Sequence, residues 1–166
     1  MSFPVNGRTM RLLFLALLLC PAAGYLSAET ANQNAEKALS LLRADNFDFR
    51  STNSPTVWSI HFPGNHMKDI KVVVAVGDDP HTSLVVFVTV AEKKRLPITT
   101  DFMRALLKEA HNVDRVKIEF DRDEDLSVRI DAALRITDAA EFKFIVNQVE
   151  HVSDELYGMI QPQLGE

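Results

Sequence analysis

The sequence predicts an α+β domain in which helices pack on an antiparallel sheet of about five strands. Short apolar segments separated by turn-forming residues indicate meandering strands, which pair antiparallel because their connections are short. Toward the end of the chain, apolar residues recur every three or four positions, which indicates a long amphipathic helix. Together these patterns predict the element order αβββαββα within one domain.

The first half of the chain contains one predicted helix and three predicted strands. The helix covers residues 30–44 and carries a narrow apolar stripe rich in alanine, which favours close packing against a flat sheet. The first strand covers residues 57–62, where large apolar side chains alternate with other residues. A Pro-Gly-Asn turn follows it, and the next two strands, 70–76 and 84–90, flank a second turn at residues 77–80.

Strands 70–76 and 84–90 are apolar on both of their faces. One face belongs to the core, and a sheet that is apolar on its other face is normally covered there as well. Two covers fit this pattern: the first or last helix wraps round the sheet, or the second face contacts another chain, which is an identical copy or a client protein. The second-face residues, which form our candidate protein-contact face, are Val73, Ala75, Val85 and Phe87.

A second helix and a hairpin follow. Thr99 or Thr100 is the N-cap of a helix that continues to about residue 110. Strands 116–120 and 126–130 then alternate apolar and polar residues on either side of an acidic turn, which is typical of a half-exposed hairpin.

The final helix has the clearest boundaries. Asp138 is its predicted N-cap, and Glu141 three residues later makes a start that is similar to a capping box. The apolar stripe then continues for about five turns until Pro162 ends the helix. We expect this helix to anchor the fold through Phe142, Val149 and Leu156.

The order of these elements resembles that of the YbjN family, whose fold is similar to that of type III secretion chaperones. The resemblance extends in element order over the mature chain, and the stretch 107–160 carries its marks. It implies a chaperone-like α+β fold and a protein partner, and it carries no catalytic motif. The marks in this sequence are Asn112, the acidic turn 121–125, the strand 126–130, Asp154 and Tyr157.

Residues 1–28 have the organisation of a secretory signal peptide. Arg8 and Arg11 form a positively charged region, residues 12–20 are apolar throughout, and small residues follow. The apolar run is shorter than the roughly 20 residues that a membrane-spanning helix needs. We therefore expect an exported protein that resides in the periplasm or outside the cell.

Cleavage after Ala28 fits the pattern best and leaves a mature domain of residues 29–166; cleavage after Gly24 is a second site that fits. Without cleavage, the segment would anchor the domain to the membrane. A lipoprotein is the remaining alternative, but Leu19 stands before Cys20 where lipoprotein processing needs a small residue. After cleavage we expect no stable membrane insertion.

Removal of the signal changes the chemistry that is available to the protein. The only cysteine, Cys20, leaves with it, so the mature chain can form no disulfide and no thiol-based metal site. The whole chain has 18 basic and 23 acidic side chains, and loss of Arg8 and Arg11 brings the net charge from −5 to near −7. An acidic domain without a basic patch disfavours nucleic acids and anionic membranes as partners.

No motif in the sequence indicates catalysis or a cofactor. It contains no P-loop, no GxGxxG and no GxSxG. Glu119, Asp121 and Asp131 offer the carboxylates that glycoside chemistry uses, but their place on the polar side of a hairpin is what solvation alone predicts. We therefore assign no catalytic residue and no cofactor.

Two groups of residues contain potential metal ligands. The turn 121–125 begins like a calcium loop, but Leu126 and Ala132 occupy the positions that an EF-hand gives to glycine and glutamate. The histidines near predicted turns have no HxH or HExxH spacing, so they do not indicate zinc. These histidines are His61, His66 and His81.

These observations predict an exported, non-catalytic protein-binding module that is chaperone-like or an adaptor and that forms a homodimer. The alternative is a small-ligand carrier or an unrecognised hydrolase with a pocket between the sheet and the last helix. The alternative requires convergent polar groups inside an apolar cavity, whereas the binding module requires an exposed apolar strip.

The first prediction concerns processing. The mature N-terminus should lie between Tyr25 and Glu29, because the small residues that signal peptidase prefers occur there. Intact-mass measurement on protein recovered from the periplasm tests this, and a mass that retains residues 1–22 would contradict it.

Overall fold

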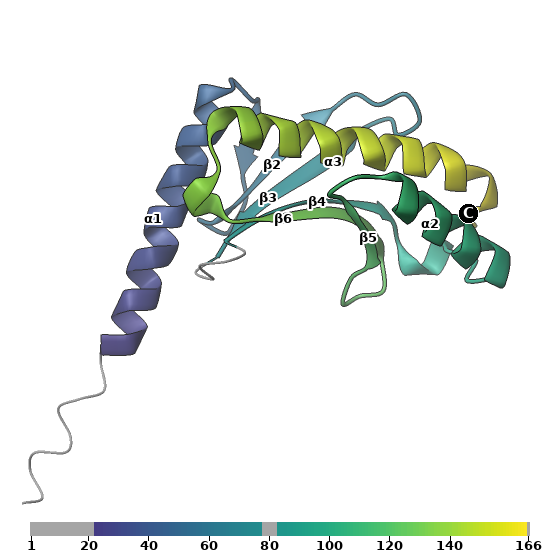
Figure 1. The fold of residues 1–166 in the computed structure, drawn as a ribbon, viewed down its shortest axis with the longest axis horizontal. Coiled ribbons are helices and arrows are strands. Elements are labelled where there is room, and N and C mark those ends of the chain that lie inside the picture. The colour runs from purple at the N-terminus through teal and green to yellow at the C-terminus, as the bar shows by residue number, and fades with distance from the viewer. Residues whose placement is uncertain (1–21, 78–82, 166) are drawn as a thin grey trace, which may run out of the picture.

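The computed structural model describes residues 22–77 and 83–165 and has the predicted α+β architecture (Figure 1). A long helix, α3, covers one face of an antiparallel sheet, while α1 crosses one end of the sheet and α2 lies toward the other end (Figure 1). The helices are α1 (Ala22–Ala44), α2 (Thr100–Asn112) and α3 (Ala139–Ile160), with short 3-10 helices η1 (Lys93–Arg95), η2 (Leu134–Ile136) and η3 (Gln161–Gln163).

The described strands form a six-stranded sheet in the order β1-β2-β3-β4-β6-β5, and every neighbouring pair is antiparallel. β3 and β4 are therefore the central pair, with two strands on either side. The strands are β1 (Phe49–Ser51), β2 (Val57–Phe62), β3 (Ile70–Val76), β4 (Leu84–Ala91), β5 (Lys117–Phe120) and β6 (Leu126–Ala132).

The two predicted helix starts are confirmed by their caps. The hydroxyl of Thr99 accepts a hydrogen bond from the backbone N–H of Phe102. The Asp138 carboxylate accepts one from the N–H of Glu141 at 2.8 Å. Each bond satisfies one of the N–H groups that a first helical turn leaves without a partner.

Several details differ from the prediction. The sheet has a sixth strand, β1, which is only three residues long and leaves no periodic signal. Within the described residues, α1 extends from Ala22 rather than from residue 30, because most of the residues between these positions favour a helix. The Glu141 carboxylate pairs with Arg115 instead of returning to the N-cap, so the capping box is only half formed.

The core lies between α3 and the sheet. α3 packs on β3, β4 and β6. Its inward side chains are completely buried, which fills the layer where the small-ligand alternative places a pocket. Among the fully buried residues of this helix are Phe142, Ile145, Val146, Val149 and Ile160.

The second prediction tests the anchoring role of α3. Phe142→Ala should lower the free energy of unfolding by about 3–5 kcal/mol, because the ring is fully buried and leaves a cavity. Val149→Ala removes fewer atoms and should cost less. Phe144→Ala, on the exposed side of the same helix, is the control and should cost less than about 1 kcal/mol. Urea unfolding measures all three, and a Phe142→Ala variant as stable as the parent would contradict the packing.

Candidate functional site

The four residues of the candidate contact face lie side by side at the centre of the sheet. Val73 is directly opposite Phe87, and Ala75 is directly opposite Val85, across the β3–β4 pair. All four are half-buried, whereas Val72, Val74 and Val86 on the other face are fully buried beneath α3. We call the four residues Val73, Ala75, Val85 and Phe87 the central strip, and the side of the sheet that carries them the open face.

A charged network borders the central strip on β5 and β6. The Arg129 guanidinium donates to the Asp131 carboxylate at 2.6 Å and to the Glu119 carboxylate at 3.2 Å. Lys117 donates to the second oxygen of Asp131 at 2.5 Å. Glu119 and Asp131, two of the three carboxylates considered for glycoside chemistry, are therefore bound to a shared cation on the sheet surface.

The electrostatics of this network favour the charged state of Asp131. Partial burial alone would raise the pKa of its carboxyl group. The hydrogen bonds and charges of Lys117 and Arg129 outweigh burial and lower this pKa below its ordinary value. The carboxylate form of Asp131 is thus favoured, and with its two cationic partners it forms a polar border beside the strip.

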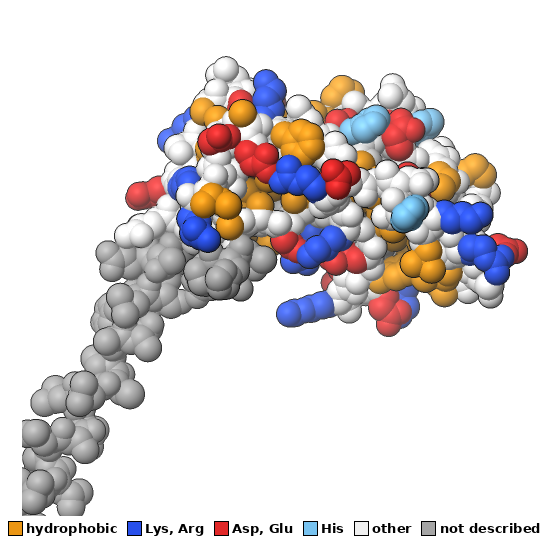
Figure 2. All heavy atoms as spheres, viewed as in Figure 1, with side chains coloured by type: hydrophobic (Ala, Val, Ile, Leu, Met, Phe, Trp, Pro, Cys, Tyr) orange, Lys and Arg blue, Asp and Glu red, His pale blue; other side chains and the backbone are white. Residues whose placement is uncertain are grey.

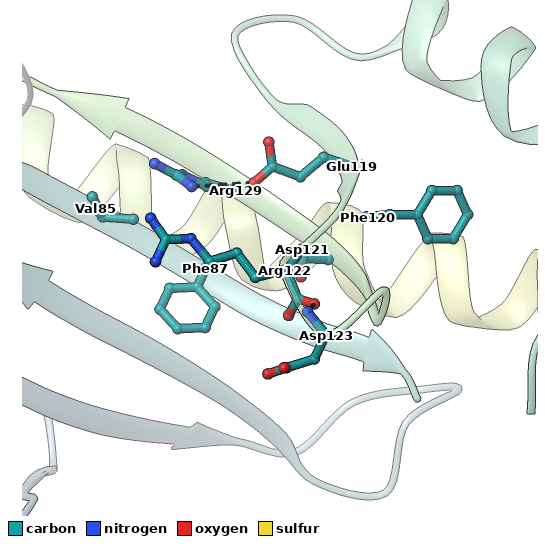
Figure 3. A pocket seen from close by; sticks show the side chains of 9 residues that line it. Val85, Phe87, Glu119, Phe120, Asp121, Arg122, Asp123 and Arg129 are labelled. Carbon is teal, nitrogen blue, oxygen red and sulfur yellow. Dashed lines mark hydrogen bonds and ion pairs between the residues drawn. The ribbon is translucent and has the colours of Figure 1, made fainter. Parts of the chain in front are cut away.

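A groove of about 600 Å³ lies where the central strip meets the β5–β6 hairpin (Figure 3). Val85 and Phe87 from β4 and Arg129 from β6 line it, and the turn at residues 121–123 forms one wall. In Figure 3 the Arg122 side chain extends from the turn back toward the strip. The groove therefore combines apolar and charged groups on the open face.

Ser127 lines this groove and is unlike its neighbours. Alternation along β6 predicts a solvent-exposed serine, but the residue is only 3% exposed. Its hydroxyl oxygen is buried and has no hydrogen-bond partner among the described residues. A buried hydroxyl without a partner is costly, so this atom is a candidate for a contact that a bound molecule supplies.

The acidic turn is held by its own backbone. The Asp121 carboxylate accepts hydrogen bonds from the N–H groups of Asp123 at 2.9 Å and Asp125 at 3.0 Å. Asp125 in turn accepts one from the N–H of Lys93 at 2.7 Å. The Asp121 side chain thus stabilises the turn itself, as the hairpin interpretation expects, and the Asp125 side chain joins the turn to η1.

The three histidines have different surroundings. His81 lies outside the described residues. The Nδ1 atom of His61 lies 3.0 Å from the Asp69 carboxylate on the open face. His66 lies beside Asp154 and Glu155, with the potential ligand atoms of these three residues within 4.8 Å of one another. The sequence did not predict this group, because α3 supplies two of its members almost ninety residues away.

Backbone hydrogen bonds explain how the carboxylate of Asp154 can be buried. It is 3% exposed, and its carboxylate accepts bonds from the N–H groups of Asn65 at 2.8 Å, His66 at 3.0 Å and Met67 at 2.7 Å. Burial raises the pKa of this carboxyl group, but the three donors outweigh burial and lower it. Gly64 allows the close approach, since a Cβ atom there would overlap the Asp154 carboxylate and the backbone of Met67. Asp154, one of the residues that carry the family resemblance, is thus a structural link between α3 and the β2–β3 connection.

A comparison with protein-family models finds no match, and a comparison with curated proteins finds no similar chain. None of the described helices is both long enough and apolar enough to cross a membrane.

Elsewhere on the surface, acidic and basic side chains are interspersed, and hydrophobic side chains gather over α2, where Leu107 is 69% exposed (Figure 2).

The third prediction concerns Asp154. Asp154→Asn should lower the free energy of unfolding at neutral pH by about 1.5–3 kcal/mol, because hydrogen bonds to a charged acceptor are lost. The pKa is lowered in the folded state, so this stability is present above the ordinary carboxyl pKa and is lost as the pH falls through the folded value. The difference between the parent and the variant should therefore shrink in acid.

Glu155→Gln, at the exposed neighbouring position, is the matched control for Asp154→Asn and should leave the stability nearly unchanged. Chemical unfolding at neutral and acid pH measures both variants. A variant Asp154→Asn that is as stable as the parent at neutral pH would show that the link carries no stability.

Proposed function

We propose that this protein is an exported, non-catalytic binding module that holds another polypeptide chain on the open face of its sheet, in a chaperone-like or adaptor role. One observation carries the proposal: the central strip is apolar, lies at the middle of the sheet and is not covered by α3. An apolar strip with a polar border is the composition of a protein interface with a core and a rim.

Exposure to solvent does not explain the apolar composition of the central strip. The polar residues expected on a solvent-facing strand are present on β6 but are replaced by valine, alanine and phenylalanine on β3 and β4. Apolar patches in the middle of a surface are typical of interaction sites. The strip therefore supports binding rather than a purely structural sheet surface.

The charged side chains of β5 and β6 that border the central strip support a non-catalytic role. Arg129 is held by Glu119 and Asp131, and Asp131 is also held by Lys117. A carboxylate whose pKa is lowered, as that of Asp131 is, is a weaker base than an ordinary one. The network instead offers charges that select and orient a partner.

The proposed location of the protein is based on its N-terminal segment. Arg8 and Arg11, the apolar run 12–20 and the small residues after it support export to the periplasm or beyond. An exported domain without cysteine relies on its core and its partner for stability, because no disulfide is available.

The fourth prediction tests the open face. Phe87→Glu should leave the protein folded and abolish partner capture and self-association, because a half-buried position tolerates a charge whereas a closed interface does not. Val73→Glu, on the opposite strand of the same pair, is a second variant in case the first is unstable. Phe144→Glu, on the exposed side of α3, is the control and should behave like the parent.

Thermal melts establish that each variant is folded, and light scattering together with capture from envelope extract measures association. If Phe87→Glu and Val73→Glu are folded and associate like the parent, the open face is not the binding surface. If both variants unfold while Phe144→Glu does not, the strip is part of the core and the proposal fails as well.

A further inference from the structure

We infer that His66, Asp154 and Glu155 form a binding site for a divalent transition-metal ion of the zinc class, and that the ion fastens the β2–β3 connection to the end of α3. None of the three residues belongs to the central strip or lines the groove on the open face. The metal site is therefore separate from the surface on which the proposed function depends.

Three potential ligands converge here from two distant parts of the chain. His66 comes from the β2–β3 connection, whereas Asp154 and Glu155 are consecutive residues of α3. The ligand atoms of these residues all lie within 4.8 Å of one another. An imidazole nitrogen with two carboxylate oxygens is a donor set that suits zinc, whereas calcium and magnesium prefer oxygen ligands alone.

Asp154 retains the acceptor capacity that a metal ligand needs. A carboxylate offers about four lone-pair sites on its two oxygens. Oδ1 accepts hydrogen bonds from the N–H groups of His66 and Met67, whereas Oδ2 accepts one only from the N–H of Asn65. One site on Oδ2 is therefore left for an ion. The backbone bonds orient the carboxylate in the way that second-shell donors orient a metal ligand.

Gly158 gives the His66 ring its place beside the two carboxylates. It follows Asp154 by four residues and Glu155 by three, so these positions are neighbours on the surface of α3. A Cβ atom at Gly158 would lie 2.6 Å from Cγ of His66, so the ring lies directly on the helix backbone. Glycine destabilises a helix interior relative to alanine, and the close approach of the ring requires it at this position.

The third ligand can close on the ion. Zinc lies about 2.0–2.2 Å from nitrogen and oxygen ligands, so the ligands of a tetrahedral site are closer together than these atoms are at their widest spacing. Glu155 is exposed, and its carboxylate forms no hydrogen bond or ion pair within the described parts of the chain. Rotation of this side chain therefore narrows the site without breaking an existing bond.

A bound ion would add a further link where Asp154 already joins α3 to the β2–β3 connection. His66 and Asp154 are 88 residues apart in the sequence, so the unfolded chain does not hold these ligands together. A ligand that binds only the folded state stabilises it in proportion to the logarithm of its concentration once the site is occupied. We therefore expect zinc to raise the melting temperature in a concentration-dependent manner.

The test uses protein that is recovered after export, freed of metal with a chelator and supplied with zinc chloride alone. Titration calorimetry should show one zinc ion bound per chain, and thermal melts should shift upward as zinc increases. His66→Ala and Glu155→Gln should each weaken binding at least about tenfold, because each removes one of three ligands. His111→Ala, at an exposed histidine of α2 outside the group, is the control and should bind zinc like the parent.

Two further measurements locate the ion. Gly158→Ala keeps all three ligands but displaces the His66 ring, so it should also weaken zinc binding. In the parent, zinc should shift the backbone amide NMR signals of residues 65–67, whose N–H groups bond to Asp154. Calcium and magnesium at the same concentration should leave these signals and the melting temperature unchanged.

Melts of the metal-free variants establish that they are folded. A parent that binds no zinc, zinc binding that persists at full strength in folded His66→Ala and Glu155→Gln, or an equal response to calcium would overturn the inferred site. None of these results bears on the open face, which the Phe87→Glu and Val73→Glu variants test separately.

Discussion

The packing of α3 on one face of the sheet is the interaction on which the rest of the structure depends. α3 contacts β3, β4 and β6, and its inward side chains are completely buried against them. Burial of apolar surface is the main favourable term in folding, so this layer supplies most of the stability of a domain without disulfides. Because α3 occupies only one face, the other face of the central strands is left for a different use.

The position of α3 is fixed at two places far apart along its length. At its start, Asp138 caps the helix, and Arg115 from the loop before β5 pairs with Glu141. Near its end, Asp154 accepts three backbone hydrogen bonds from the β2–β3 connection. These contacts at both ends fix the position of the helix on the sheet, in addition to the packing of its buried side chains.

The sequence predicted the elements whose signals are local. Alternation defined β2 to the residue, an apolar run between turn signals defined β3 to the residue, and capping residues defined the starts of α2 and α3. The parity of the strands also placed Val73 and Phe87 on one face. Three features could not be predicted from the sequence. β1 is too short to show a period, Ser127 is buried although alternation along β6 places it on the polar face, and Asp154 binds a backbone N–H group 88 positions away. Local patterns carry no information about such distances.

The open face balances two opposing requirements. A sheet surface that is apolar enough to bind a chain is also prone to indiscriminate association, which proteins limit with charges near the exposed strands. Here the strip is restricted to the central pair, while Arg129, Asp131 and Lys117 on one side and Lys71 on the other border it. A mismatched chain would have to desolvate these charges without compensation, whereas a chain with complementary charges exchanges water for ion pairs. Under the proposed function, this border would limit association with most chains and orient a partner with complementary charges.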